Sequence, residues 1–385
     1  MQSYLSEPRR NRRAGSHQSA TAPNGSRRSR GEPWQVLLRR SVTTLEGLTR
    51  YLPDVDLRGL ADVIRRYPMA INPYYLELIT GRGNGLYQQA VPDARETSVK
   101  AGFRDPLGEE RLSPVPGLTH KYPDRVLFLI SSRCAMYCRF CNRKRKVGQA
   151  SMVTDETIRE GLAYIRHTPT VRDVLLSGGD PLLLEDQKLY DILSRLRAIS
   201  HVEIIRIGTR VPCTLPQRVT PALVKLLKAF HPLYVNTHFN HPSEITPQAA
   251  RACTRLADAG IPLGCQTVLL KKVNDDASTM TQLMRKLVAI RVRPYYLFQA
   301  DLTEGTAHFW TPLQKGTEIM EALQGYTSGL CVPRLMIDLP GGGGKIPLTP
   351  DYILKRSENE LLVRNYRGEP YVFPLQNAEM KNGVL

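Results

Sequence analysis

The chain has 385 residues, a formal net charge of +17 at pH 7 and a hydrophobic content of 42%. This length allows one large domain or two to three ordinary ones. No apolar run is long enough to span a membrane and no signal-peptide core follows Met1, so we expect a cytoplasmic protein without a membrane partner. The seven cysteines, three of them clustered, do not form the pattern of a disulfide framework. The positive charge alone leaves open nucleic acid, a membrane surface or acidic small molecules as partners.

Residues 1–33 are rich in Arg, Ser, Gly and Pro and poor in apolar side chains. Such a segment cannot bury enough apolar surface to offset the entropy of folding, so we predict a disordered basic tail. An organellar transit peptide would have a similar composition and is the weaker alternative.

Residues 34–118 have the periodicity of short helices. The stretch "SVTTLEGLTRYL" predicts a helix capped by Ser41 or Thr43, and "LRGLADVIRRY" places Leu, Leu, Val and Ile on one face. We expect a helical segment that contributes no catalytic residue.

From residue 119 to 350, strand-like and helix-like stretches alternate. The expected strands are "RVLFLIS", "DVLLSGG", "VEIIRIGTR", "PLYVNTHFN", "PLGCQTVLL", "RPYYLFQAD" and "PRLMIDLP", each separated from the next by a helical stretch. This alternation predicts a mostly parallel α/β sheet, closed or partly closed as a barrel, with functional residues at the carboxyl ends of the strands. Polar or reactive residues stand at those ends: Cys134, Ser177, Arg210, His238, Gln266, Asp301 and Asp338. Residues 351–385 predict a C-terminal β extension, with a hairpin turn at Arg367-Gly368 or at Glu358-Asn359.

Three cysteines follow the first expected strand in "SSRCAMYCRFCNRKRK". Zinc prefers four ligands in two pairs, and no second pair follows, so zinc is the weaker interpretation. Three thiolates can instead hold an iron–sulfur cluster that keeps one iron open for a small molecule. The spacing of Cys134, Cys138 and Cys141, with Phe140 before the last, resembles the radical S-adenosylmethionine (SAM) enzymes. The resemblance implies a [4Fe-4S] cluster, SAM and the barrel variant of that superfamily, a partial (β/α)6 TIM-like barrel.

The stretch Ser177-Gly178-Gly179-Asp180 follows the second expected strand. Alone it could be any tight turn. One β/α unit after the cysteines, it resembles the glycine-rich segment of the superfamily, in which the backbone and an acidic group hold the amino group of SAM.

A second glycine-rich stretch, "LPGGGGKIP", is not a phosphate-binding loop, because that motif requires Gly where Leu339 stands and Ser or Thr where Ile346 stands. A lysine on such a loop, here Lys345, can form a Schiff base with pyridoxal 5′-phosphate (PLP).

With these motifs, "THKYPDR", "NTHFNHPSEIT", "PYYLFQADLTEGTAHF" and "DLPGGGGKIPLTP" resemble lysine 2,3-aminomutase and its relatives, over roughly residues 34–375. The resemblance implies that Lys345 carries PLP, and that the PLP phosphate is held by Lys121, Tyr122 and Arg125. It places His238 and Gln266 near the adenosyl group. For the substrate, it implies a carboxylate site at Arg143 and an ε-ammonium site at Asp301 and Asp338. For Lys144, Arg145 and Lys146 we expect only a solvated basic loop.

The activity that this resemblance implies is an isomerase that moves the α-amino group of L-lysine to the β-carbon. Arginine 2,3-aminomutase remains an alternative, because a guanidinium could use the same two acids; a glutamate enzyme is disfavoured by them. An RNA-modifying radical SAM enzyme is the alternative from another class, but it would leave the PLP lysine unexplained, so nucleic acid is not the expected partner. Expected partners are an electron donor of the flavodoxin or ferredoxin class and further copies of the chain. The lysine enzymes that this chain resembles bind zinc between subunits through a cysteine of the C-terminal tail and a partnering cysteine. Such a site is not expected here, because the final residues "NAEMKNGVL" contain no cysteine and Asp276 stands where the partnering cysteine would be.

Overall fold

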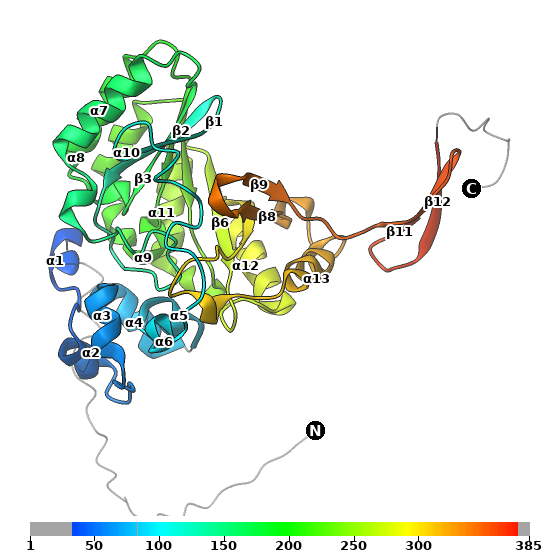
Figure 1. Cartoon of the computed structure of the whole chain (residues 1–385), viewed down its shortest axis with the longest axis horizontal. Coiled ribbons are helices and arrows are strands. Elements are labelled where there is room, and N and C mark those ends of the chain that lie inside the picture. The colour runs from blue at the N-terminus through cyan, green and yellow to red at the C-terminus, as the bar shows by residue number, and fades with distance from the viewer. Residues whose placement is uncertain (1–32, 83, 376–385) are drawn as a thin grey trace, which may run out of the picture.

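The computed structural model describes residues 33–82 and 84–375 (Figure 1). Of the predicted basic tail, residues 1–33, all but Pro33 lie outside this part of the chain. Within it, no helix combines the length and the apolar character that crossing a membrane requires.

Six short helices open the described chain: α1 (Trp34–Arg39), α2 (Leu45–Tyr51), α3 (Leu60–Arg66), α4 (Pro73–Arg82), α5 (Asn84–Ala90) and α6 (Arg95–Ser98). The cap of α2 is neither Ser41 nor Thr43: the hydroxyl of Thr44 accepts a hydrogen bond from the backbone N–H of Gly47 at 3.1 Å. The cap lies three residues after Ser41 and one after Thr43, because each of these hydroxyl residues could cap a helix and the extended backbone at Thr44 selects that residue. From residue 99 to 117 the chain forms turns and isolated bridges rather than helices.

One nine-stranded sheet follows, and its strands neighbour one another in chain order. The strands are β1 (Leu118–Tyr122), β2 (Arg125–Ser131), β3 (Asp173–Gly178), β4 (Ile204–Gly208), β5 (Leu233–Thr237), β6 (Leu263–Leu269), β7 (Arg293–Gln299), β8 (Arg334–Leu339) and β9 (Gly344–Pro347). The connecting helices are α7 (Asp155–Arg166), α8 (Asp186–Arg197), α9 (Val211–Thr214), α10 (Pro221–Lys228), α11 (Pro247–Asp258), α12 (Ala277–Ala289) and α13 (Leu313–Leu323).

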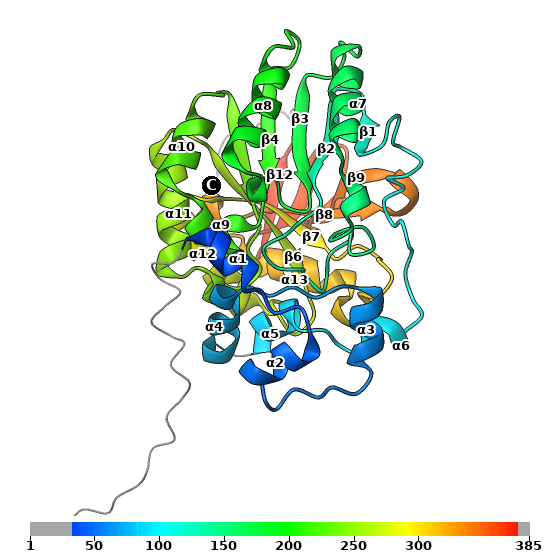
Figure 2. The same ribbon diagram turned by 90° about the vertical axis from the view of Figure 1, so that its left-hand side faces the viewer.

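Strands β2 to β8 are all parallel, while β1 and β9 pair antiparallel at the two edges. Six helical crossovers join the parallel strands, and Figures 1 and 2 show their helices on the outer face of the curved sheet. Among the described strands β1 does not pair with β9, so the barrel is partial. The predicted fold class, a partial (β/α)6-type barrel with N-terminal helices and a C-terminal β extension, is confirmed.

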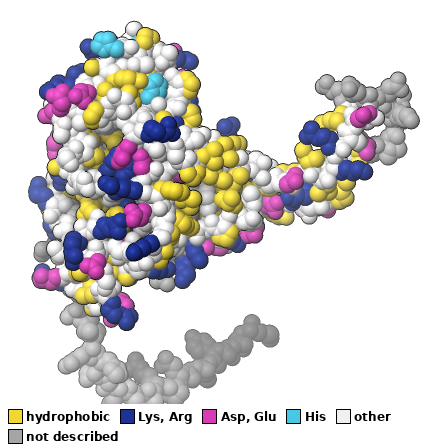
Figure 3. All heavy atoms as spheres, viewed as in Figure 1, with side chains coloured by type: hydrophobic (Ala, Val, Ile, Leu, Met, Phe, Trp, Pro, Cys, Tyr) yellow, Lys and Arg dark blue, Asp and Glu magenta, His cyan; other side chains and the backbone are white. Residues whose placement is uncertain are grey.

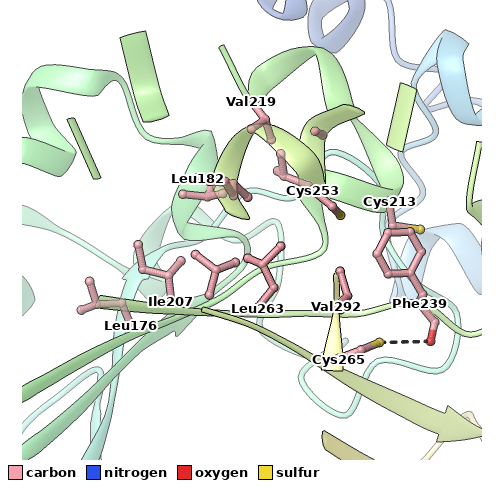
Figure 4. Packing of buried hydrophobic residues seen from close by; sticks show 14 of the residues in the cluster. Leu176, Leu182, Ile207, Cys213, Val219, Phe239, Cys253, Leu263, Cys265 and Val292 are labelled. Atoms are coloured by element: carbon pink, nitrogen blue, oxygen red, sulfur yellow. Dashed lines mark hydrogen bonds between the residues drawn. The ribbon is translucent and has the colours of Figure 1, made fainter. Parts of the chain in front are cut away.

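The core lies between the sheet and its helices, and four of the seven cysteines belong to it. Cys213, Cys253, Cys265 and Cys331 are buried and unbridged, and Figure 4 shows three of them packed among Val, Leu and Phe side chains. The same cluster of buried side chains includes Val42 and Tyr75 of the N-terminal region. The N-terminal helices therefore share the core of the barrel instead of forming one of their own.

The C-terminal extension is a separate three-stranded antiparallel sheet of β10 (Ile353–Arg356), β11 (Glu360–Arg364) and β12 (Pro370–Pro374). Both predicted turns form, one on each side of β11. The sheet projects from the barrel as an arm (Figure 1), and apolar side chains are exposed on it (Figure 3), including Tyr371, Val372 and Phe373 at 54%, 58% and 60%.

Candidate active site

A cavity of about 960 Å³ occupies the interior of the partial barrel. Every residue that the sequence predicted for a cofactor or substrate site lines it. Most of them come from the carboxyl ends of the strands or the loops after them, as expected where parallel strands end at one edge of a sheet; Arg125 begins β2 and Lys345 lies near the start of β9.

The three clustered cysteines lie on the loop after β2, and none is disulfide-bonded. This loop is held by the N-terminal helical region: the N–H of Tyr137 donates to the carbonyl of Ala70 at 3.0 Å, and that of Arg139 to Gln89 at 2.9 Å. The helical segment, for which the sequence suggested no role in the site, therefore supports the cysteine loop.

The environment of the thiols fits ligands of a metal cluster. Burial raises the pKa of Cys134 far above its usual range and that of Cys141 to about 11, so ionisation requires a compensating cation such as iron. N–H donors face the sulfurs: Arg210 Nη1 lies 2.8 Å from Cys138 Sγ, and the backbone N–H of Arg143 3.4 Å from Cys141 Sγ.

The sulfurs do not surround a single ion. Among the described residues, no three His, Cys, Asp or Glu side chains form a group that could hold one metal ion. The thiolates that bind a four-iron cluster lie farther apart than those that bind a single ion. The observation that fits a cluster is therefore that three thiols line one cavity.

The two glycines at the end of β3, Gly178 within the strand and Gly179 after it, are required by close packing. A Cβ at Gly178 would lie 2.1 Å from the carbonyl oxygen of Ser131, and one at Gly179 2.4 Å from that of Arg133. Gly178 also has a φ of +131°, which favours glycine. The glycines thus let the loop after β3 lie directly against the start of the cysteine loop, with Ser177 beside them on the cavity wall.

Asp180 ends this segment and is hydrogen-bonded to neighbouring loops. Its buried carboxylate accepts hydrogen bonds from the hydroxyl of Thr209 and the backbone N–H groups of Leu182, Arg210 and Val211, at 2.7 to 3.1 Å. These donors occupy both oxygens, so Asp180 holds the loop after β4. Contact of Asp180, and of the backbone around Gly178 and Gly179, with the amino group of SAM stays a prediction.

His238 and Gln266, the residues expected near the adenosyl group, lie on the wall formed by β5 and β6. Burial, and then the charge of Arg210, lower the pKa of His238 to about 3, so its ring is neutral. The ring lies 5.5 Å from that of Phe140 and forms a 2.9 Å hydrogen bond with Asn240. A wall of neutral polar and aromatic side chains suits an uncharged part of a ligand.

Lys345 and Asp338 face each other across the β8–β9 hairpin. Lys345 Nζ lies 2.5 Å from one carboxylate oxygen of Asp338, and Lys121 Nζ lies 2.8 Å from the other. Tyr122 accepts a hydrogen bond at its hydroxyl from the backbone N–H of Lys345, at 2.9 Å, and its ring stacks 4.0 Å from the guanidinium of Arg125. The predicted PLP lysine and the three predicted phosphate ligands are therefore neighbours, and their amino, hydroxyl and guanidinium donors fit a phosphate dianion.

Asp301 follows β7 and is held by Asn142, whose amide donates to it at 2.8 Å. Burial raises the pKa of Asp301 to about 6. Burial alone would also raise the pKa of Asp338, but the cations of Lys345 and Lys121 outweigh it and lower that pKa. The ends of β7 and β8 thus present two carboxylates to the cavity, one of them already accepting primary ammonium donors.

Arg143 is paired in the structure with Glu109, which accepts hydrogen bonds from its Nε, at 3.0 Å, and from its Nη2. The expectation of a solvated loop beyond it is wrong for two residues. Lys144 is buried against Glu96 at 2.7 Å, and Arg145 pairs with Asp105 and Glu110. The sequence could not show this, because the acids that pair with these cations are 34 to 48 residues away.

Sequence reasoning missed four buried charged residues around the site. Arg210 was noted at a strand end without a role, yet it contacts Cys138 and also Glu244 at 2.8 Å. Glu96 and Glu109 lie in the region predicted to lack functional residues. Both stand in polar stretches, "PDARETSVK" and "DPLGEERL", so the local sequence gave no sign that they are buried.

Most of the chain is similar to known proteins of one family. The model of a family described as "Lysine-2,3-aminomutase" matches residues 320–382, and that of the "Radical SAM superfamily" matches residues 128–283. An L-lysine 2,3-aminomutase of Clostridium subterminale is 51% identical over 87% of this chain and 82% of its own. That of Bacillus subtilis is 46% identical over 89% of this chain and 74% of its own. A glutamate 2,3-aminomutase of Clostridioides difficile is 41% identical over 87% and 80%. The chain belongs to the lysine 2,3-aminomutase family of radical SAM enzymes.

Proposed function

We propose that this chain is an isomerase that converts L-lysine to β-lysine by moving the α-amino group to the β-carbon. The observation that carries the proposal is the pair of carboxylates, Asp301 and Asp338, in the same cavity as Lys345 and Arg143. A lysine substrate needs a cation for its carboxylate, a PLP lysine for its α-amino group and carboxylates for its ε-ammonium. Arg143, Lys345 and the two acids offer these in one cavity.

The family implies three cofactors: a [4Fe-4S] cluster, SAM and PLP. When bound, they supply a radical that removes hydrogen from the β-carbon and a pyridine ring over which the unpaired electron of the migrating group spreads. In this chain Cys134, Cys138 and Cys141 would hold the cluster, and Lys345 would hold PLP, with its phosphate at Lys121, Tyr122 and Arg125.

The chain itself positions the substrate. Arg143 binds the α-carboxylate through its guanidinium, which suits a planar anion better than an amine does. Asp301 and Asp338 bind the ε-ammonium, and the contact of Asp338 with Lys345 supports a primary ammonium at that position. The surrounding barrel keeps water from the reacting carbon, and fixed orientation lowers the barrier to the shift.

The two acids also favour lysine over glutamate, because a side-chain carboxylate would meet two like charges in a buried site. The lysine enzymes of Clostridium subterminale and Bacillus subtilis are 51% and 46% identical to this chain, against 41% for the glutamate enzyme of Clostridioides difficile. The two acids and these identities support a cationic side chain on the substrate.

We also propose a cytoplasmic enzyme that receives electrons from a protein of the flavodoxin or ferredoxin class and assembles with further copies of itself. Free cysteines and a reducible cluster need a reducing compartment. The net charge of +17 would attract an acidic donor protein.

The test is to reconstitute the full chain with iron, sulfide and PLP, add SAM and a reductant, and offer lysine, arginine and glutamate separately. We expect β-lysine, detected by chromatography against authentic β-amino acids. If arginine is converted and lysine is not, the acids keep their role and the proposed substrate is wrong. If none is converted by protein that carries its cofactors, the proposed activity is wrong.

A further inference from the structure

Residues 105–113, which we call the clasp, precede β1 and contact two separate parts of the site. On one side, Asp105 and Glu110 pair with Arg145 of the cysteine loop at 3.2 and 3.0 Å. On the other side, the carbonyl of Pro106 accepts a hydrogen bond from the N–H of Gly341 at 2.8 Å, and Arg111 Nη2 donates to the carbonyl of Gly341 at 2.7 Å.

The clasp lies tightly against the glycine loop that precedes Lys345. A Cβ at Gly108 would lie 3.0 Å from the backbone of Gly341, and a Cβ at Gly342 would lie 2.7 Å from the side chain of Leu112. The two segments are therefore in direct backbone contact, which fixes one relative to the other.

Glu109 is the acid of the clasp that lines the cavity, and it is only 6% exposed. Its carboxylate accepts from Nε and Nη2 of Arg143, which is a side-on pair. This pairing uses two of the five N–H donors of the guanidinium and leaves the edge formed by Nη1 and the second N–H of Nη2 for another carboxylate.

The separation between Arg143 and Lys345 matters for an α-amino acid. The carboxylate and the amino nitrogen are both bonded to Cα, so the groups that bind them must be held at a fixed distance. Arg143 follows β2 and Lys345 lies on β9, and these strands are near opposite edges of the open sheet. The hydrogen-bond ladder across seven intervening strand pairs does not set this distance directly, whereas the clasp contacts Arg143 through Glu109 and the glycine loop that precedes Lys345 through Pro106 and Arg111.

We infer that Glu109 is a positioning residue for the 2,3-amino shift: it orients the Arg143 guanidinium toward the substrate carboxylate, while the clasp sets the distance from Arg143 to Lys345. The inference rests on the proposed function. It predicts that Glu109 affects binding of the substrate carboxylate and leaves the cofactors in place.

The experiment compares Glu109→Gln and Glu109→Ala with Glu46→Gln, a matched change at an exposed acid of α2 that lies outside the clasp and the cavity. We expect Glu109→Ala to raise KM for lysine about tenfold or more with a smaller change in kcat, Glu109→Gln to have an intermediate effect, and Glu46→Gln to stay within about twofold. Iron and PLP contents should equal those of the wild type. If Glu109→Ala loses its cofactors, the KM of Glu109→Gln, which keeps the side-chain shape, decides whether Glu109 is a positioning residue.

A second readout removes the group that Arg143 is meant to bind. Lysinamide keeps both amines of lysine but has no carboxylate, and its binding can be followed, like that of lysine, by the change in PLP absorbance. The loss of affinity caused by Glu109→Gln should be present for lysine and absent for lysinamide. An equal loss for both ligands, or tighter binding of lysine by the variant, would overturn the inference; the latter would mean that Glu109 competes with the substrate.

The absorbance measurement also separates this inference from the proposed function, because it needs binding and no turnover. Wild-type protein that binds lysine but forms no β-lysine defeats the proposed activity, and the comparison of lysine with lysinamide still decides the role of Glu109.

Discussion

Asp301 and Asp338 stand at the ends of neighbouring strands, but their surroundings shift their pKa values in opposite directions. Asp338 lies between two lysine ammonium groups and stays ionised below its usual range, whereas burial raises the pKa of Asp301 to about 6. Two carboxylates that look alike in the sequence therefore lose their charge at different pH values.

The first prediction concerns the pH dependence that follows from Asp301. Below pH 6 the protonated Asp301 no longer compensates a buried ammonium, so kcat/KM for lysine should fall as the pH is lowered through about 6. Initial rates between pH 5 and 8 measure this. Asp301→Asn should have a low kcat/KM throughout and lack this step. The role of Asp301 is refuted if the variant keeps the same step.

At the scale of elements, the loop that carries the cysteines is secured by a buried ionic group from the N-terminal helices. Glu96, whose side chain is fully buried, accepts hydrogen bonds from Arg139 and from Lys144. Arg139 also donates to the carbonyls of Tyr67 and Pro68. One acid thus compensates two cations of the cysteine loop.

Replacing Glu96 should therefore be costly. Glu96→Ala would leave Arg139 and Lys144 buried without a carboxylate, which costs about 3–5 kcal/mol of unfolding free energy. Urea denaturation measures the loss, and iron content per chain should fall with it because the loop loses its support.

The matched control is Glu46→Ala, which removes an exposed partner of Arg50 on α2. Exposed ion pairs contribute little, so its effect should be below about 1 kcal/mol. Unchanged stability and full iron binding in Glu96→Ala would contradict the assigned role of Glu96.

At the scale of the whole molecule, the arm exposes apolar side chains that the barrel does not cover. In Figure 1 the β10–β12 sheet extends away from the barrel, and Tyr371, Val372 and Phe373 are each more than half exposed. A small sheet with exposed apolar residues is stabilised by packing against another surface.

We predict that the arm contributes to self-association. Replacing Val372 and Phe373 by Ser should lower the particle mass measured by light scattering after gel filtration, because the change removes apolar area from the contact. Leu57→Ser, at an exposed apolar residue of the N-terminal region, should leave the mass unchanged. A wild type that is already monomeric would disprove the prediction.

The basic tail is predicted to be dispensable for the chemistry. Removing residues 1–32, which lie outside the described part of the chain, should change turnover by no more than about twofold, because their composition does not support a packed structure. Activity of the truncated and full chains, measured at equal iron content, tests this. An inactive truncation with intact cofactors would show that the tail takes part.

The sequence by itself determined the order of strands and helices and the positions of most of the site. The period of apolar residues defines each β/α unit, and parallel strands must end at one edge, so Cys134, His238, Asp301 and Asp338 could be assigned to one cavity from the sequence alone. The loop that carries Lys345 could be recognised as well, because four consecutive glycines leave the backbone free to approach a ligand closely.

Only the tertiary structure decided which partners the buried charged residues have. Glu109 with Arg143, Glu96 with Lys144, and Asp180 with the loop after β4 are contacts between residues 29 to 48 positions apart. Periodicity reports which face of an element is buried, but it does not report which distant side chain meets it there. A buried charge can be stable only with such a partner, so its role is fixed by the fold and not by the local sequence.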